Sequence, residues 1–371
     1  MDPLKTFCPN PDCPAKGQTG RDNIGVHSHK ERRFICHVCH QTFAESTGTT
    51  FYRLRTPAEV VTQVVTLLAF GCPVQAIVAA FGFDERTVQD WQARAGQHAE
   101  QVHQHLVGQP RDLGQVQADE IRVKGQGVIL WLAMALQVPT RLWLGATLSP
   151  KRDMALIEAL IQKVRACALC RPLLICIDGL SSYVQAIRLT FREPVPRRHQ
   201  LGRPKLRPWD GVFIAQVVKQ YAGHAVTGIE RRIVQGTATE IQALIRATQG
   251  IGGINTAYIE RLNATFRARM ANLVRRGRAL VRQEATLYQA AYLMGTVYNF
   301  CTYHHSLRVR GILGGRKWLP RTPAMAAGLA DHRWTVQELL VYRVPLPVWS
   351  PPKRRGRVSK ATKALVAKWC R

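Results

Sequence analysis

Three acidic residues lie at positions where a charged side chain is better explained by metal binding or catalysis than by solubility. Asp119 lies within the apolar run Gln115–Val123, Asp178 directly follows the apolar run Leu173–Ile177, and Glu260 lies in a stretch with helical periodicity. An acid at the carboxyl end of a strand, followed here by Gly179, faces the crevice where α/β sheets bind ligands. Carboxylates are preferred ligands of Mg²⁺ or Mn²⁺, and two such ions about 3.5–4 Å apart support phosphodiester transfer. The set predicts a two-metal phosphoryl-transfer site.

Each acid also has an ordinary interpretation that the sequence leaves open. Asp119 fits a helix cap or loop, Asp178 fits a turn, and Glu260 could pair with a nearby arginine. Glu120 is the main alternative to Asp119, since neighbouring strand residues point to opposite faces and only the register decides between them. We expect Asp119 to face the site.

Four cysteines near the N-terminus have the spacing of a metal site. Cys8 and Cys13 are separated by four residues, Cys36 and Cys39 by two, and 22 residues lie between the pairs. Two close pairs can surround one tetrahedral Zn²⁺, and a small polar region has few other ways to fold. We expect these four as zinc ligands in a zinc ribbon; the alternatives are unpaired buried thiols, or a nearby histidine replacing one cysteine.

Other cysteines and histidines give weaker signals. Cys167 and Cys170 lie in a helical run without a second pair, so we expect a structural role. His304 and His305 could position a phosphate, but a structural role or a contact with the DNA backbone is the stronger expectation.

The charge balance favours a polyanionic partner. The 371 residues include 52 Lys and Arg against 24 Asp and Glu, a formal net charge of +28. Such an excess repels itself in a compact protein unless nucleic acid offsets it. The sequence begins without an apolar signal segment, and its longest apolar stretch, Val128–Leu136, is too short to span a membrane. We therefore expect a protein that is not secreted and that binds nucleic acid rather than a membrane.

Three helical runs after the cysteine-rich region predict a helix-turn-helix module. The runs are Pro57–Phe70, Val74–Phe81 and Glu85–Ala95, with Gly82 in the turn and Asp84 as the N-cap of the third. A third helix so placed enters the major groove. Its outward residues Arg86 and Gln89 are our candidates for DNA contacts, although an ordinary three-helix unit gives the same pattern.

The elements that must position the three acids follow in a definite order. Strands and helices alternate as three strands, a helix, a strand, a helix and a later helix. This order predicts an α/β fold, a ribonuclease-H-like mixed sheet with flanking helices. The expected elements are strands at Gln115–Val123, Val128–Leu136, Arg141–Leu148, Leu173–Ile177, Val212–Lys219 and Ala225–Val234, and helices at Met154–Ala168, Ser182–Phe191, Thr239–Ala247 and Tyr258–Arg275.

The motifs around these acids resemble a known family. Gln117-Ala-Asp-Glu-Ile121, Ile177-Asp-Gly-Leu180 and Asn255-Thr-Ala-Tyr-Ile-Glu-Arg-Leu-Asn-Ala-Thr-Phe-Arg267 are similar to motifs of bacterial insertion-sequence DDE transposases with an N-terminal zinc ribbon and helix-turn-helix. Tyr298-Asn-Phe-Cys-Thr-Tyr-His-His-Ser-Leu307 and Arg321-Thr-Pro-Ala-Met-Ala-Ala-Gly328 resemble the family's C-terminal end.

The resemblance implies that Asp119, Asp178 and Glu260 bind Mg²⁺ as a catalytic triad. It also implies terminal inverted repeats and target DNA as substrates, and a homo-oligomer assembled on DNA. Water would cleave the transposon end, and the liberated 3′-hydroxyl would then carry out strand transfer. We expect further DNA contacts from five basic residues: Arg203, Lys205, Arg207, Arg261 and Arg267.

The predicted organisation has four parts. Residues 1–50 form the zinc ribbon, 51–108 the helix-turn-helix domain, 109–340 the catalytic domain with a basic insertion at about 194–235, and 341–371 a basic tail. Two alternative functions remain at this point. One is a non-enzymatic zinc and helix-turn-helix DNA-binding regulator, and the other is a nuclease on the same core that cuts DNA without joining it.

Overall fold

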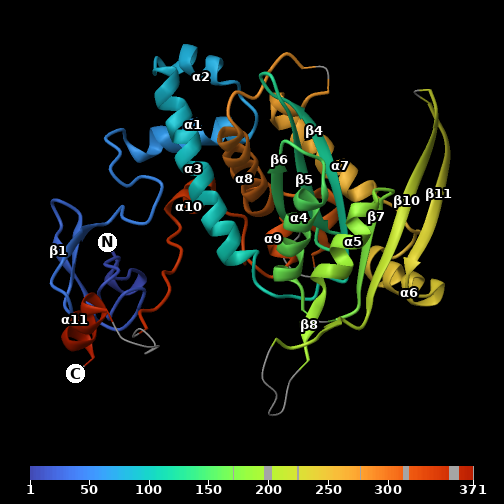
Figure 1. The fold of residues 1–371 in the computed structure, drawn as a ribbon. Coiled ribbons are helices and arrows are strands. Elements are labelled where there is room, and N and C mark those ends of the chain that lie inside the picture. Colours follow the sequence, from blue (N-terminus) through green and yellow to red (C-terminus); the bar gives the residue numbers. More distant parts are fainter. Residues whose placement is uncertain are drawn as a thin grey trace. The chain divides into compact units, whose positions relative to one another are not determined.

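A computed structural model describes residues 1–169, 171–195, 203–223, 225–275, 277–311, 317–350 and 359–370. The chain divides into two compact units (Figure 1). The first comprises Met1–Val60 and Leu340–Arg371, and the second comprises Val61–Leu339.

The first unit is built on a small antiparallel sheet. Its strands are β1 (Ile24–Ser28), β2 (Arg33–Cys36) and β3 (Thr42–Ala44), in the order β1-β2-β3. Phe34 and three cysteines lie in its small core, where few other apolar side chains are available. A separate helix, α11 (Lys360–Trp369), lies near the C-terminus of the chain.

The second unit is mixed α/β, with a six-stranded mixed sheet and flanking helices. Its sheet strands are β4 (Gln115–Lys124), β5 (Ile129–Gln137), β6 (Trp143–Ser149), β7 (Leu173–Asp178), β10 (Val212–Ala222) and β11 (Ala225–Gln235). Its longer helices are α1 (Ala58–Ala69), α2 (Val74–Phe81), α3 (Glu85–Leu106), α4 (Met154–Cys167), α5 (Ser181–Thr190), α6 (Ala238–Gln249), α7 (Ala257–Arg269) and α8 (Glu284–Cys301). Shorter elements are β8 (Arg192–Pro194), β9 (Leu206–Pro208), β12 (Val309–Arg310), β13 (Trp318–Leu319), α9 (Pro323–Ala326) and α10 (Val336–Val341). The boundary between the units falls within α1 and within α10.

The strand order of this sheet is β11-β10-β7-β4-β5-β6. The β4–β5 and β5–β6 pairs are antiparallel, whereas β7 pairs in parallel with both β4 and β10. The six strands agree with those expected from the sequence to within a few residues, because their apolar runs are bounded by Gly, Pro or charged residues.

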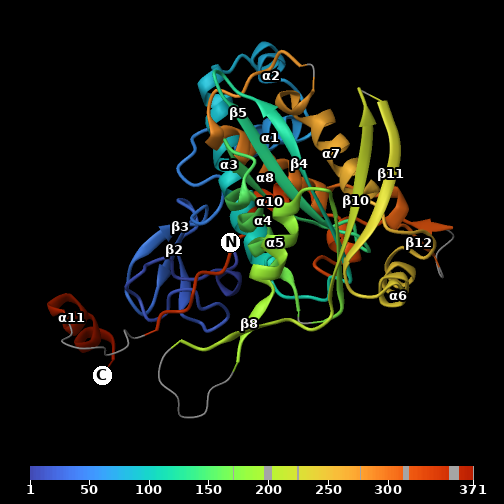
Figure 2. The same cartoon turned by 45° about the vertical axis from the view of Figure 1, so that its right-hand side comes forward.

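Helices cover both faces of the sheet (Figures 1 and 2). On one face, side chains of β4, β5 and β6 pack against α7 and α8, with Trp143, Phe266 and Tyr292 among the fully buried rings. The opposite face carries α4 and α5. Burial of the apolar stripe Ile259, Leu262 and Phe266 fixes which side of α7 faces the sheet.

The helix α3 is much longer than its sequence pattern indicated. The expected helix Glu85–Ala95 continues to Leu106, and its second half packs along α8. Gly96 permits this approach, since a Cβ there would lie 2.4 Å from the carbonyl oxygen of Gln289. Polar residues such as His103 hid the pattern, although His103 is buried against the ring of Trp143.

Two further expectations need correction. The helix expected at Tyr258–Arg275 ends at Arg269, because Met270 adopts an extended conformation. The segment expected as a basic insertion at about 194–235 lies partly in the main sheet, where β10 pairs in parallel with β7. Continuous burial in the first half of β10 explains this, since an apolar run favours a central strand. Cys170, residues 196–202 of the basic stretch and residues 351–358 of the tail lie outside the described residues.

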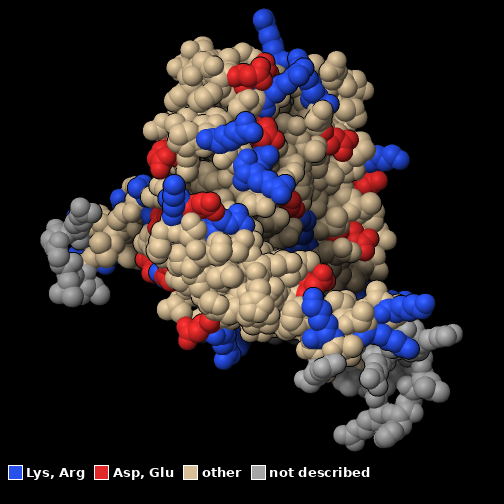
Figure 3. All heavy atoms as spheres, turned by 90° about the vertical axis from the view of Figure 1, so that its left-hand side faces the viewer, with Lys and Arg blue, Asp and Glu red and all other residues tan. Residues whose placement is uncertain are grey.

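Positive charge is spread over the surface. On the face drawn in Figure 3, Lys and Arg side chains form several separate groups with Asp and Glu between them. Among the described residues, no helix is both long and apolar enough to cross a membrane.

Candidate metal centres

The end of the β4–β7 pairing positions two of the three acids. These parallel strands are hydrogen-bonded as far as Gln117 and Cys176. Asp119 and Asp178 each lie two residues further along, where the two strands are no longer paired. Such a separation at the carboxyl ends of parallel strands forms a ligand-binding crevice.

Glu260 reaches the same crevice from the first turn of α7. The buried Gln117 side chain fixes this helix, because its Oε1 accepts hydrogen bonds from the backbone N–H groups of Tyr258 and Ile259, each at 3.0 Å. Its Nε2 donates to the carbonyl oxygen of Asn255 at 2.7 Å. Gln117 therefore replaces the side-chain cap that Thr256 does not provide and links β4 to the helix that carries Glu260.

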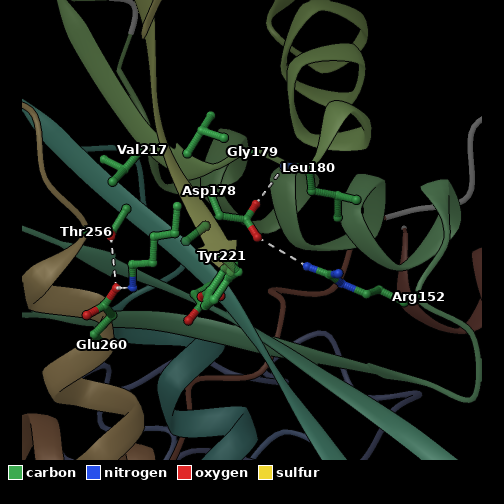
Figure 4. A pocket seen from close by; sticks show the side chains of 12 residues that line it. Arg152, Asp178, Gly179, Leu180, Val217, Tyr221, Thr256 and Glu260 are labelled. Carbon is green, nitrogen blue, oxygen red and sulfur yellow. Dashed lines mark hydrogen bonds and ion pairs between the residues drawn. The ribbon is translucent and has the colours of Figure 1, made fainter. Parts of the chain in front are cut away.

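All three predicted acids line one pocket of about 440 Å³ (Figure 4). Each is held by hydrogen bonds from its surroundings. Asp119 accepts from Nδ2 of Asn263 at 2.7 Å, and Asp178 accepts from the backbone N–H of Leu180 at 3.0 Å. The structure thus brings together three residues that are far apart in the sequence.

Two cations neutralise this pocket from its rim. Arg152 donates to Glu120 at 3.0 Å and to Asp178 at 3.2 Å, and Lys219 pairs with Glu260 at 2.6 Å. Neither cation was singled out from the sequence. Arg152 lies in a loop after β6 and Lys219 on a strand expected outside the core, so only the tertiary fold brings them to the acids.

Glu120 lies closer to the other acids than strand alternation indicated. One carboxylate oxygen of each of Asp119, Glu120 and Asp178 lies within 4.8 Å of the others. Because β4 has no partner from β7 here, side chains from both faces of β4 can approach the crevice. Glu120 Oε2 is buried without a hydrogen-bond partner among the described residues, which leaves a ligand atom available.

Burial raises the pKa of two of these carboxyl groups. It raises the pKa of Asp119 to about 6 and that of Glu120 to about 7, and the negative charge of Asp178 adds to both shifts. Hard oxygen ligands with this unfavourable mutual charge are suited to a divalent cation such as Mg²⁺ or Mn²⁺. Asp119, Asp178 and Glu120 lie close enough together to hold such an ion once Arg152 is displaced, and Glu260 would likewise have to exchange Lys219 for it.

The four N-terminal cysteines form a second, separate cluster. Their sulfur atoms all lie within 4.8 Å of one another, with Cys8 3.7 Å from Cys39 and Cys13 3.9 Å from Cys36. A tetrahedron with Zn–S bonds of about 2.3 Å has edges of about 3.8 Å, so these separations suit one zinc ion. Among the described residues, none of the nearby histidines belongs to this cluster.

The thiols of this cluster differ in acidity. Burial raises the pKa of Cys8 far above its usual range and that of Cys13 to about 11. Burial acts in the same direction on Cys39, but hydrogen bonds from the Gln41 backbone and the Asn10 side chain outweigh it and lower the pKa to about 7. Cys39 therefore ionises more readily than Cys8 and Cys13.

The residues expected to contact DNA lie on exposed or partly exposed surfaces. Arg86 and Gln89 are exposed on α3, where Gln89 Nε2 donates to Glu85 at 2.7 Å. Asp84 caps this helix through the Arg86 N–H, and Gly82 has a φ of 68°, so the turn has its expected geometry. Arg203 and Lys205 are exposed.

Three further predicted DNA contacts have different surroundings. Arg207 is exposed and pairs with Glu193 at 2.6 Å across the small β8–β9 sheet. Arg267 is partly buried on α7, and Asp119 is among the charges that act on it. Arg261 does not line the acidic pocket, but a second pocket on another side of α7.

Comparisons with known proteins add no assignment. No family model matches the chain, and a search of curated proteins finds no match.

Proposed function

We propose that the chain is a DNA transposase that cleaves and joins DNA strands with two divalent metal ions held by acidic residues. The main support for the proposal is that Asp119, Asp178 and Glu260 line one pocket. These acids come from two neighbouring parallel strands and a helix, the arrangement expected for a ribonuclease-H-like core. The strand order β6-β5-β4-β7-β10 supports this, with two antiparallel pairs followed by two parallel ones.

The side chains of the pocket have separate tasks in this proposal. Asp119, Asp178 and Glu260, with Glu120 beside them, would hold Mg²⁺ through carboxylate oxygens. When bound, the ions supply activation of the attacking oxygen and stabilisation of the leaving oxygen. Asn263 holds Asp119 in place, and Gln117 anchors the helix that carries Glu260. Arg152 and Lys219, once released from the carboxylates, are near enough to the pocket to bind the phosphate of the substrate.

The upstream modules would supply DNA recognition. The cysteine cluster supports a zinc ribbon, and α1, α2 and α3 support a helix-turn-helix in which Arg86 faces DNA. A net charge of +28 supports binding that weakens steeply with salt, because each phosphate contact releases counterions.

The test is a cleavage and joining assay with Mg²⁺ on DNA that carries the sequences flanking the gene. Wild type is compared with Glu260→Gln, which keeps the shape and removes the charge, and with Glu284→Gln as a matched control on α8. We expect wild type and the control to cleave and join, and Glu260→Gln to bind DNA without either reaction.

The same assay separates the alternatives. Cleavage without joining would favour a nuclease on this core. Equal behaviour of wild type and Glu260→Gln would remove the catalytic proposal and favour a DNA-binding regulator.

A further inference from the structure

A second pocket lies on another side of the helix that carries Glu260. It has a volume of about 530 Å³, and α7 contributes Tyr258, Arg261 and Thr265 to its wall. These positions recur at helical spacing and therefore share one face, whereas Glu260 is turned about 100° from Arg261. Helix α7 thus separates the acidic pocket from a pocket lined by basic residues.

Positive charge dominates the lining of this second pocket. Arg141, Arg261 and Arg269 contribute to it, together with His304 and His305, and no carboxylate does. None of the three arginines has an ion-pair partner among the described residues, and Arg269 Nη1 is buried there without a hydrogen bond. In the acidic pocket, by contrast, every cation faces a carboxylate.

The charges in this pocket act on one another. Burial, together with the positive charges of Arg141 and Arg261, lowers the pKa of His304 to about 4. Burial also lowers the pKa of Arg269. Cations held together in this way, with no acid beside them, are best compensated by an anionic ligand.

Aromatic rings alternate with these cations. Tyr258, Tyr298 and Tyr303 line the same pocket, and Arg141 lies 3.9 Å above the ring of Tyr258. Tyr303 remains 45% exposed, and because Arg333 lies 4.8 Å over its ring, a planar group would stack on the opposite ring face. A basic groove with interleaved aromatic rings is the pattern by which proteins bind single-stranded nucleic acid.

We propose that this pocket binds a phosphodiester group, with its attached base against a tyrosine, of an unpaired DNA strand that continues into the acidic pocket. The inference rests on the proposed function, since it supplies a second contact for the same substrate strand. The two pockets lie on different sides of α7, about one helix diameter (~10 Å) apart, so one flexible strand can contact both.

The experiment measures binding without chemistry. The full-length, zinc-loaded protein is titrated into a fluorescein-labelled single-stranded oligonucleotide without added Mg²⁺ or Mn²⁺ over a series of salt concentrations, with anisotropy as the readout. The variant is Arg261→Gln, at an exposed position on α7, and the matched control is Arg246→Gln, an exposed arginine on α6. A second variant, Tyr303→Leu, removes a half-exposed ring without changing charge.

We expect Arg261→Gln to weaken binding about tenfold and to reduce the salt dependence by about one phosphate contact, with Arg246→Gln within about twofold of wild type. Tyr303→Leu should weaken binding about fivefold while leaving the salt dependence unchanged. Equal binding by Arg261→Gln, Arg246→Gln and wild type would overturn the proposal.

Competition with inorganic phosphate distinguishes the source of the anion. Displacement of the oligonucleotide only at phosphate concentrations that act as general salt supports a nucleic-acid strand. Specific displacement by dilute phosphate, lost in Arg261→Gln, would show a pocket for a free anion and overturn the proposal. Because no Mg²⁺ or Mn²⁺ is added, a protein that fails the cleavage assay can still pass this one, so failure of the proposed function and failure of this inference are separate results.

Discussion

The cysteine cluster and the acidic pocket are both candidate metal centres, but without a metal ion their negative charge is neutralised in different ways. Cys8, Cys13 and Cys36 are fully buried, and burial raises the pKa of the Cys8 and Cys13 thiols, so that protons neutralise them without a metal. The acidic pocket is open, and side-chain cations neutralise part of its negative charge. Arg152 and Lys219 lie within 3.2 Å of its carboxylates.

This difference indicates different roles. A buried set of four thiolates leaves no position for a substrate, as in structural zinc sites. An open pocket with exchangeable cations leaves room for a metal ion and for the phosphate that follows it. A metal ion would therefore release protons from the cysteine cluster and displace Arg152 and Lys219 in the acidic pocket.

The largest expected effect is loss of the cysteine cluster. We expect Cys36→Ser to lose bound zinc and to unfold the small sheet of the first unit, because structural zinc in small domains contributes on the order of 10 kcal/mol. The measurements are zinc content and thermal unfolding followed by circular dichroism. Cys72→Ser, at a half-buried cysteine outside the cluster, should retain both properties. Unchanged zinc content in Cys36→Ser would contradict a zinc-binding role for the cysteine cluster.

A smaller effect of opposite sign is expected at Asp119 in metal-free protein. Its pKa of about 6 lies above the ordinary value of 3.8, so its contribution to stability is present below about pH 4 and lost as the pH rises through 6. Asp119→Asn should therefore raise the free energy of unfolding of the second unit by about 1–3 kcal/mol at pH 7 without added Mg²⁺. The gain should vanish near pH 4. Urea unfolding at both pH values tests this, with the exposed Asp210→Asn as control.

The pH dependence of metal binding distinguishes the two centres further. Zinc affinity should fall at least tenfold between about pH 8 and about pH 7, because the buried thiols must lose protons to bind it. Mg²⁺ affinity should change less over this interval, since the pKa of Asp119 is about 6 and that of Glu120 about 7. Chelator competition for zinc and calorimetry for Mg²⁺ provide the measurements. If zinc and Mg²⁺ affinity changed equally over this interval, the result would contradict the view that the cysteine thiols are protonated in the metal-free protein.

The smallest expected effect concerns the competing cation. Arg152→Gln removes a positive charge from Glu120 and Asp178, and we expect Mg²⁺ affinity to rise about two- to fivefold, because this half-exposed ion pair is partly screened by solvent. Calorimetry would measure it, with the exposed Arg171→Gln as control. A fall in affinity would mean that Arg152 instead holds the carboxylates in their binding positions.

The sheet was predictable because its strands are short apolar runs bounded by turn residues. The same reasoning predicted Asp119, Asp178 and Glu260 as one set, and the structure places all three in one pocket. Cys8, Cys13, Cys36 and Cys39 were likewise predicted together from local spacing, and they cluster.

What the sequence could not supply depends on contacts between distant segments. Gln117 anchors α7 from another element, and Arg152 and Lys219 approach the acids only after the sheet has formed. Glu120 was set aside by strand alternation, a rule that does not account for the separation of β4 from β7. The second half of α3 was missed because its buried His103 looks polar in sequence.

The most direct test of the central claim asks whether substitutions of Asp178 change which metal ion supports strand cleavage. Strand cleavage is measured with Mg²⁺ and with Mn²⁺ for wild type, Asp178→Asn and Asp178→Cys. A thiolate is a poor ligand for Mg²⁺ and a better one for the softer Mn²⁺. We predict cleavage by wild type with either ion, none by Asp178→Asn, and recovery of Asp178→Cys with Mn²⁺ alone. Cleavage by both variants at the wild-type rate with Mg²⁺ would contradict a metal-binding role for Asp178 and, with it, the proposed active site.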